Sequence, residues 1–209
     1  ANFYAEDVVC KVNDVVVPIS DWSNHGDDWS GSISLIEDGD YFVTMEYRDR
    51  SGNVMNTYTS SQITIDTIAP QIETNWAAER LIQTKDNINY SQEDMSVTIV
   101  IHERNFRAQD VEAVVTAVDA AGVDVPVDDY AGYLKDAQNW TREGDMHTAV
   151  LNFPADANYT FTIQFRDMVF HSAEEYEPYA FSVDKTPPRD LTIEYSTPIL
   201  ESILNAVTF

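Results

Sequence analysis

The chain has 209 residues, of which 44% are hydrophobic and 11% aromatic, a composition that suits packed cores and argues against disorder. Its 36 Asp and Glu residues outnumber 12 Lys and Arg residues, and the net charge of −24 repels nucleic acid and anionic membranes. No apolar run approaches the ~18 residues of a membrane span. We therefore expect no nucleic-acid partner and no membrane insertion of this segment.

Short β-strands separated by turns are predicted along the whole chain. Alternation of apolar and polar residues predicts strands within 41–47, 96–101, 146–153, 159–165 and 181–183. Residues 108–118 could form a helix, but their β-branched valines favour a strand. Turn-forming residues cluster between these segments, at 38–40, 50–53, 120–122 and 154–156. Many short strands with frequent turns predict an all-β fold of the sandwich type.

The sequence also repeats itself, first at an offset of 103 residues and later at an offset of 118. A self-match at nearly fixed spacing is typical of a modular array. The 15-residue difference places an insertion in the second copy, between its first and last thirds. The matched segments are 2–8 with 105–111, 40–49 with 158–167, and 66–70 with 184–188.

Three motifs of the first copy carry a family resemblance. Asp38-Gly39-Asp40-Tyr41 leads into an alternating strand, Asp49-Arg50-Ser51-Gly52-Asn53 follows that strand, and a later strand ends in Asp66-Thr67-Ile68-Ala69-Pro70. This arrangement resembles the bacterial immunoglobulin-like modules of surface proteins, which implies tandem immunoglobulin-like β-sandwiches. The second copy keeps the first and third motifs. Residues 167–171 lack the Gly-Asn pair, so we expect their hairpin to be built differently.

The resemblance implies three parts. Residues 1–67 form an immunoglobulin-like module without strands A and B, and residues 68–187 form a complete module with strand A near 71–76 and strand B near 95–101. Residues 188–209 contain the first strand of a third module. A module without two strands exposes an unpaired sheet edge, and such edges recruit other strands. We therefore expect the apolar tail, residues 191–209, to donate a strand to the incomplete module of the same or another chain.

Motifs for catalysis are scarce. The sequence has no His-Glu-x-x-His, no Gly-x-Ser-x-Gly and no phosphate-binding glycine loop, and its four histidines are scattered. The single cysteine, Cys10, lies in an apolar run and is interpreted as a core thiol that can form no internal disulfide. We expect the chain not to be an enzyme and to need no cofactor, with calcium as the one alternative.

Calcium prefers about six to eight oxygen ligands in a flexible site, and the loops are rich in carboxylates. Asp49 follows a predicted strand, and Asp66 and Asp184 end the last strand of each copy beside a proline. These three residues are the candidate calcium ligands. The alternative is that Asp49 caps its own hairpin and that the other two form turns.

Aromatic residues in the middle of each copy are candidate ligand-binding groups. Tyr130, Tyr133 and Trp140 lie in and around the insertion, where they could bind a glycan or a host protein. Trp22 aligns with Tyr130, and Trp29 aligns with Trp140. Recurrence in both copies fits a packing role equally well.

These observations predict a non-enzymatic structural or adhesive segment of an extracellular bacterial surface protein. Rigid modules joined by short proline-containing linkers would act as a stalk or binding scaffold. The alternative function is an accessory carbohydrate-binding module of a secreted enzyme.

Overall fold

The computed structural model describes residues 3–77, 81–83, 88–190 and 192. The described part of the chain is mostly β-strand, with one α-helix, and the chain divides into two compact units. Unit 1 is built on Ala1–Ala69, and unit 2 on Pro70–Met168 and the segment from Ser172. In the described part of the chain no helix has the length and apolarity to cross a bilayer. The predicted strand donor, residues 191–209, lies almost entirely outside the described residues.

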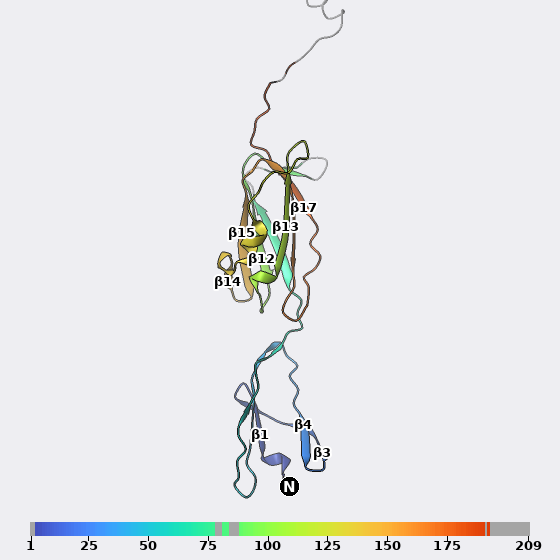
Figure 1. Ribbon diagram of the computed structural model, residues 1–209, viewed down its shortest axis with the longest axis vertical. Helices are drawn as coiled ribbons and strands as arrows, with labels where there is room; N and C mark the ends of the chain where they lie inside the picture. The colour runs from blue at the N-terminus through green and yellow to red at the C-terminus, as the bar shows by residue number, and fades with distance from the viewer. Residues whose placement is uncertain (1–2, 78–80, 84–87, 191, 193–209) are drawn as a thin grey trace, which may run out of the picture. The chain divides into compact units, whose positions relative to one another are not determined.

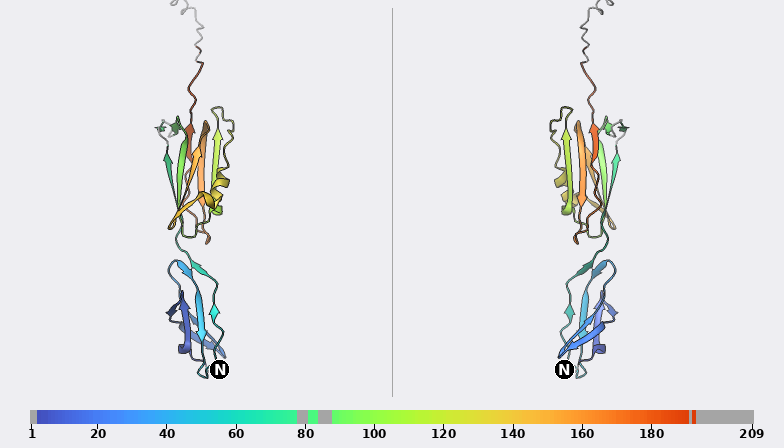
Figure 2. Two further views of the ribbon diagram at one scale, coloured as in Figure 1. Left: turned by 90° about the vertical axis from the view of Figure 1, so that its left-hand side faces the viewer. Right: turned by 90° about the vertical axis from the view of Figure 1, so that its right-hand side faces the viewer.

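Unit 2 is a β-sandwich of two sheets (Figures 1 and 2). One sheet has the order β14-β15-β12-β9 and the other the order β10-β11-β17-β16-β13. Neighbouring strands are antiparallel, except that β11 runs parallel to β17. The strands are β9 (Gln71–Ala77), β10 (Leu81–Gln83), β11 (Asn89–Ser91), β12 (Met95–His102), β13 (Val111–Val118), β14 (Thr141–Glu143), β15 (Met146–Phe153), β16 (Ala157–Phe165) and β17 (Tyr179–Val183).

The core of unit 2 follows from period-two alternation along these strands. In β12 every second residue is fully buried, and β15 and β16 alternate in the same way. The predicted strands at 96–101, 146–153, 159–165 and 181–183 are therefore confirmed, as is the preference for strand over helix at 111–118. The inward side chains of both sheets form one hydrophobic cluster that includes Ile99, Leu151, Phe161 and Phe181.

The single α-helix, α1 (Tyr130–Lys135), lies in the 15-residue insertion between β13 and β14. The Asp129 carboxylate caps it by accepting a 2.8 Å hydrogen bond from the Gly132 N–H. Tyr130 and Leu134 point from α1 into the core and are buried. Short 3₁₀ turns occupy Ala108–Asp110 (η2) before β13 and Ala137–Asn139 (η3) after α1.

Unit 1 contains fewer and shorter strands. One sheet has the order β2-β1-β6-β7, and β3-β4 and β5-β8 form two-stranded pairs. The elements are η1 (Ala5–Asp7), β1 (Val8–Val12), β2 (Val15–Val17), β3 (Ser20–His25), β4 (Asp28–Ser32), β5 (Gly39–Tyr41), β6 (Val43–Tyr47), β7 (Tyr58–Thr59) and β8 (Ile63–Ile65).

The predicted strand at 41–47 is interrupted at Phe42, between β5 and β6. Asn13 and Asp14 adopt positive φ angles and turn the chain from β1 into β2. The Asn13 side chain then accepts a 2.8 Å hydrogen bond from the Phe42 N–H and donates a 2.9 Å bond to the Asp40 carbonyl. These bonds satisfy the N–H of Phe42 and the carbonyl of Asp40. The equivalent strand of unit 2, β16, runs through this point without a break.

The two units repeat each other in strand register as well as in sequence. Val8 pairs with Tyr47 in unit 1, and Val111 pairs with Phe165 in unit 2. These residues are related by the offsets of 103 and 118 that the sequence predicts. Gly39 likewise pairs with Ile65 as Ala157 pairs with Val183. The repeat is thus structural.

The hairpin at 167–171 corrects one expectation. Its flanking bonds repeat those of the first copy, since Met55 N–H donates to the Tyr47 carbonyl and Ala173 N–H donates to the Phe165 carbonyl. Phe170 has φ 76° where Gly52 has φ 91°. The second hairpin therefore keeps the length and left-handed residue of the first, although a phenylalanine replaces the glycine that this conformation favours.

Unit 1 has a much smaller core than unit 2. Among the described residues of unit 1, the buried hydrophobic side chains are Cys10 and Val43. The interpretation of Cys10 as a core thiol is confirmed, because the residue is 1% exposed, and burial raises its thiol pKa.

We therefore predict that urea unfolds unit 1 at a lower concentration than unit 2, because less apolar area stabilises it. Modification of Cys10 by a thiol reagent should report the first transition, and near-ultraviolet circular dichroism should report both. A single transition with Cys10 protected throughout would contradict this prediction.

Candidate functional site

The structure brings the three predicted ligand-binding residues together, but it buries two of them. Trp140 is 9% exposed, and its Nε1–H donates a 2.7 Å hydrogen bond to the Leu134 carbonyl. Tyr130 is 6% exposed, its hydroxyl donates to the Asn152 carbonyl, and burial raises its pKa. Neither ring has a free face for a sugar, so both serve in packing. Tyr133 on α1 is 41% exposed.

Trp140 belongs to a cluster of rings centred on Phe106. The Phe106 ring stacks on His147 at a centroid distance of 4.1 Å and on Phe165 at 5.3 Å, and it contacts Trp140 at 4.8 Å. The cluster joins the β14–β15 hairpin to β16 in the opposite sheet. Aromatic pairs of this kind contribute about 0.5–1.5 kcal/mol each beyond their buried area.

Unit 1 contains the same cluster, centred on Phe3. The Phe3 ring stacks on Trp29 at 4.9 Å and contacts Trp22 at 5.5 Å and Tyr47 at 5.2 Å. These rings join the β3–β4 hairpin to β6, as their counterparts join β14–β15 to β16. We call the two groups the Phe3 cluster and the Phe106 cluster.

The two clusters correct the predicted aromatic alignment. The β3–β4 and β14–β15 hairpins turn at Gly26-Asp27 and Gly144-Asp145, 118 residues apart. Trp22 is therefore equivalent to Trp140, and Trp29 to His147. The predicted alignment of Trp22 with Tyr130 and of Trp29 with Trp140 is therefore wrong, because the insertion lies before Trp140 and the offset of 118 already applies there.

His147 is the one histidine that the described structure buries, at 5% exposure. Its Nε2 lies 3.0 Å from the carbonyl oxygen of Glu103, and its ring stacks on Phe106. Burial lowers the pKa of His147 below its usual 6.5, although the Glu103 carbonyl opposes part of that shift. The imidazole therefore remains neutral in the folded protein at neutral pH.

The three candidate calcium ligands follow three different strands. Asp49 follows β6 and Asp66 follows β8, which belong to different sheets of unit 1, and Asp184 follows β17 in unit 2. The Asp49 carboxylate accepts hydrogen bonds from the N–H groups of Ser51 and Asn53 and from the Asn53 side chain. These bonds, above all the Asn53 amide, lower the pKa of Asp49, which caps its own turn.

Asp66 and Asp184 each accept a bond from the N–H two residues later, at 3.4 and 3.1 Å, and so form matching turns. A second pair of carboxylates, whose role the sequence did not predict, binds the same segments. Asp38 accepts hydrogen bonds from the Thr67 N–H and hydroxyl, the latter at 2.8 Å. Its equivalent, Asp156, accepts bonds from the N–H of Lys185 and the hydroxyl of Thr186. Asp38 and Asp156 lie 118 residues apart, so the internal repeat of the sequence could have identified them as equivalent residues.

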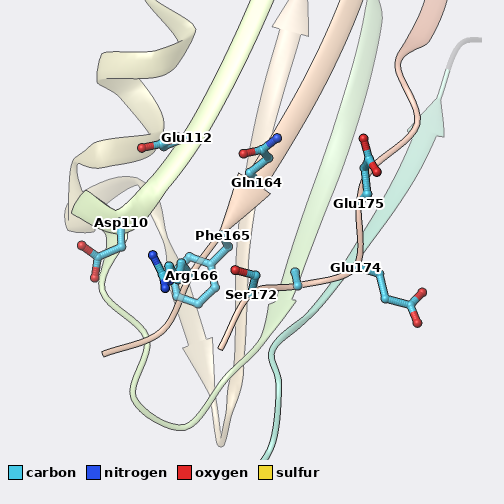
Figure 3. Close-up of a pocket in the computed structure, with 9 residues that line it drawn as sticks. Asp110, Glu112, Gln164, Phe165, Arg166, Ser172, Glu174 and Glu175 are labelled. Atoms are coloured by element: carbon cyan, nitrogen blue, oxygen red, sulfur yellow. The ribbon is translucent and has the colours of Figure 1, made fainter. Parts of the chain in front are cut away.

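Unit 2 has an open pocket of about 470 Å³, whose lining residues on β13, β16 and the segment after Ser172 are drawn in Figure 3. Its lining includes Glu112 and Gln164 on the adjacent strands β13 and β16, and Glu174 and Glu175 on the segment after Ser172. Arg166 lies among these acids. The walls carry a negative field that attracts cationic groups.

Unit 1 has an apolar groove of about 470 Å³. It opens between the β1–β2 hairpin and the segment that continues β4. Aliphatic side chains and one tyrosine dominate its walls, among them Val12, Val17, Ile33, Leu35 and Tyr41. The groove can accept apolar side chains.

Comparison with known proteins adds no identity, since no protein-family model and no curated protein sequence matches the chain.

His147 generates a prediction about pH. Because its pKa is lower in the folded state than near 6.5 in the unfolded state, the unfolded state binds the proton more readily. The stability that neutral His147 contributes should be complete above pH 6.5 and should fall as pH drops through 6.5 toward the folded-state pKa.

The measurement is the difference in unfolding free energy of unit 2 between the parent chain and His147→Phe, across pH 5 to 8. The parent should lose stability relative to the variant as pH falls. The variant keeps a ring against Phe106 and shares every carboxylate, so a pH-independent difference would contradict the prediction.

Proposed function

We propose that the chain is a non-enzymatic structural and adhesive segment of an extracellular bacterial surface protein. In this proposal its units are immunoglobulin-like modules in tandem, and they serve as a stalk or binding scaffold. The single observation that carries the proposal is the recurrence of one module, with the same strand registers, ring cluster and turn bonds, twice along one chain. Repeated modules are a means of building length.

The strand order of unit 2 supports the immunoglobulin-like assignment. If β9, β12, β15 and β14 are strands A, B, E and D, they form the ABED sheet of that fold in the expected order. Strands β13, β16 and β17 then correspond to C, F and G of the facing sheet.

The perturbed titratable groups support a structural role. The shifted groups of unit 2, Tyr130, His147 and Tyr159, owe their shifts first to burial in or beside the core. In unit 1, the pKa of Cys10 is shifted by its burial and that of Asp49 by its turn, and the pKa of Arg50, which desolvation lowers, is raised overall by its bonds to Asp7. Catalytic groups also have shifted pKa values, but each of these shifts is accounted for by burial, a turn or an ion pair.

The carboxylates at the module ends support the stalk proposal. Asp38 and Asp156 hold the first residues after β8 and β17, so each module fixes the segment that leaves it. Pro70, and Pro187 with Pro188, follow within a few residues and restrict the backbone further. Neighbouring modules of the same protein are thus the first proposed partners.

We predict that Asp38→Ala loosens the segment after β8, because Thr67 loses its hydrogen bonds to the carboxylate. The loss should cost about 1 kcal/mol of local stability. Nitrogen-15 relaxation should show a common, anisotropic tumbling time for both units in the parent and shorter, separate times in the variant.

The matched control is Glu37→Ala, which removes the same charge at the adjacent position. It should leave the relaxation unchanged. Independent tumbling of the two units in the parent chain would contradict the stalk proposal.

The alternative, an accessory carbohydrate-binding module, rests on Tyr133. This ring is exposed on α1, in the insertion that distinguishes unit 2 from unit 1. A glycan array tests it, with Tyr133→Ala compared with Tyr58→Ala, a control at an exposed tyrosine of unit 1. Binding that Tyr133→Ala alone abolishes would favour the alternative.

A further inference from the structure

The sequence contains three Asn-x-Ser/Thr triplets, the motif in which an asparagine side chain can receive a sugar. They begin at Asn89, Asn139 and Asn158, all in unit 2, and none has a proline at its middle position. A motif this short also arises by chance. The structure around each asparagine therefore has to decide which of the three can carry a sugar.

Two of the three asparagines already use their side-chain amide inside the fold. The Nδ2 of Asn89 donates to the Tyr179 hydroxyl, and the Nδ2 of Asn139 donates a 2.9 Å hydrogen bond to the Tyr133 carbonyl. Both asparagines are half-buried. The hydroxyl of the first triplet is enclosed as well, because Ser91 is 2% exposed. A sugar on either nitrogen would crowd these contacts.

Asn158 differs from the other two. It is the second residue of β16, its side chain is exposed, and in the described part of the chain its amide makes no side-chain hydrogen bond. Thr160 is exposed too, whereas Tyr159 between them is buried. Period-two alternation places the Asn158 amide and the Thr160 hydroxyl on the same outer face of the strand. Both groups of the motif therefore point to solvent together.

The sheet around Asn158 leaves room for a sugar. The residues that pair with Asn158 and Thr160 across the two neighbouring strands are uncharged, and none is larger than valine. They are Val118, Thr116, Ser182 and Ala180. A sugar on Asn158 can lie over this low surface without removing a charge from water.

Unit 1 has no such site at the equivalent position. Asp40 lies 118 residues before Asn158, and its carboxylate accepts a 2.7 Å hydrogen bond from the Thr64 hydroxyl across the β5–β8 pair. The triplet Asp40-Tyr41-Phe42 offers neither an amide nor a hydroxyl in the motif positions. The difference between the units at this point is thus one of side-chain chemistry on a shared frame.

We propose that Asn158 is an N-glycosylation site. Its substrate is a sugar activated by a phosphate at C1, carried either by a lipid diphosphate or by a nucleotide. The Asn158 Nδ2 forms a bond to C1, the bond from C1 to the phosphate oxygen breaks, and the phosphate leaves with that electron pair. One amide proton passes to a base of the transferase, and no oxidant or reductant takes part. The site does not depend on the stalk proposal.

The pairing of β16 indicates when the sugar is added. Asn158 pairs with Val118 on one side and with Ser182 on the other, so folding holds the triplet flat in the interior of a sheet. A transferase has to take the amide and the hydroxyl into one active site, which is easier while the strand is unpaired. Transfer therefore precedes the folding of unit 2, and folding then leaves the sugar on the outer face.

The timing is tested with a purified N-glycosyltransferase that uses a nucleotide-linked sugar. A synthetic peptide of residues 155–163 and the urea-unfolded chain, diluted into the reaction, should both be glycosylated faster than the folded chain. Equal rates for the folded chain and the peptide would overturn the timing.

Two substitutions of Thr160 test the site in the cells that naturally produce the protein. Thr160→Ser keeps the motif and should retain the sugar, whereas Thr160→Val keeps the shape of the side chain, removes the hydroxyl and should abolish modification. Because residue 160 is exposed, both variants should fold, and their near-ultraviolet circular dichroism should match the parent. Retention of the sugar in Thr160→Val, or its loss in both variants, would overturn the proposal.

Peptide mapping by mass spectrometry of the chain purified from those cells is the direct measurement. The peptide that contains Asn158 should carry a sugar mass, and the peptides that contain Asn89 and Asn139 should not. A single sugar would identify the nucleotide-linked donor, and a preassembled oligosaccharide would identify the lipid-linked donor. An unmodified Asn158, or equal modification of all three asparagines, would overturn the proposal.

Discussion

A β-sheet buries one face only when a second sheet covers it, and this constraint governs the whole structure. In unit 2 the constraint is met, because β12 lies between β9 and β15 and completes the sheet opposite β16. Its four inward side chains are fully buried against both sheets. In unit 1 the β3–β4 hairpin is the described part of that layer, and the core is correspondingly small.

The ring clusters show how the β3–β4 hairpin of unit 1 is held against the facing sheet. The Phe3 ring lies between two tryptophans of the β3–β4 hairpin and Tyr47 of β6, so one side chain joins elements that share no strand pairing. The Phe106 cluster does the same in unit 2, where continuous sheet pairing also holds the hairpin. The cluster is thus common to both units.

Period-two alternation predicted most of the fold, because inward residues must be apolar wherever a sheet face is buried. It identified the strands around Ile99, Leu151 and Phe161 and the repeat that relates the units. It failed at Phe42, whose N–H donates to the Asn13 side chain although its carbonyl still accepts a hydrogen bond from the Asn13 N–H. It also failed at Phe170. Sequence patterns favour glycine at positive φ, and they did not indicate that a phenylalanine adopts this conformation here.

The sites were less predictable than the strands. Tyr130 and Trp140 were predicted to bind a ligand because they are large rings in and around the insertion. Ring size, however, does not distinguish a binding residue from a core residue. The role of Asp38 and Asp156 was not predicted, because a carboxylate that accepts hydrogen bonds from a backbone segment resembles any other loop acid in sequence. Which of the three Asn-x-Ser/Thr motifs presents an exposed amide depends on side-chain contacts between distant segments, and local patterns do not contain them.

The most direct test of this account is residue-by-residue amide exchange by NMR in the unmodified chain. The account predicts that the amides of His147, Ala149 and Leu151 exchange only on global unfolding of unit 2, whereas those of Trp29, Gly31 and Ile33 exchange within about tenfold of unprotected rates. Equal protection of the two sets would show that this layer of unit 1 is covered as well as that of unit 2, and would contradict the central claim.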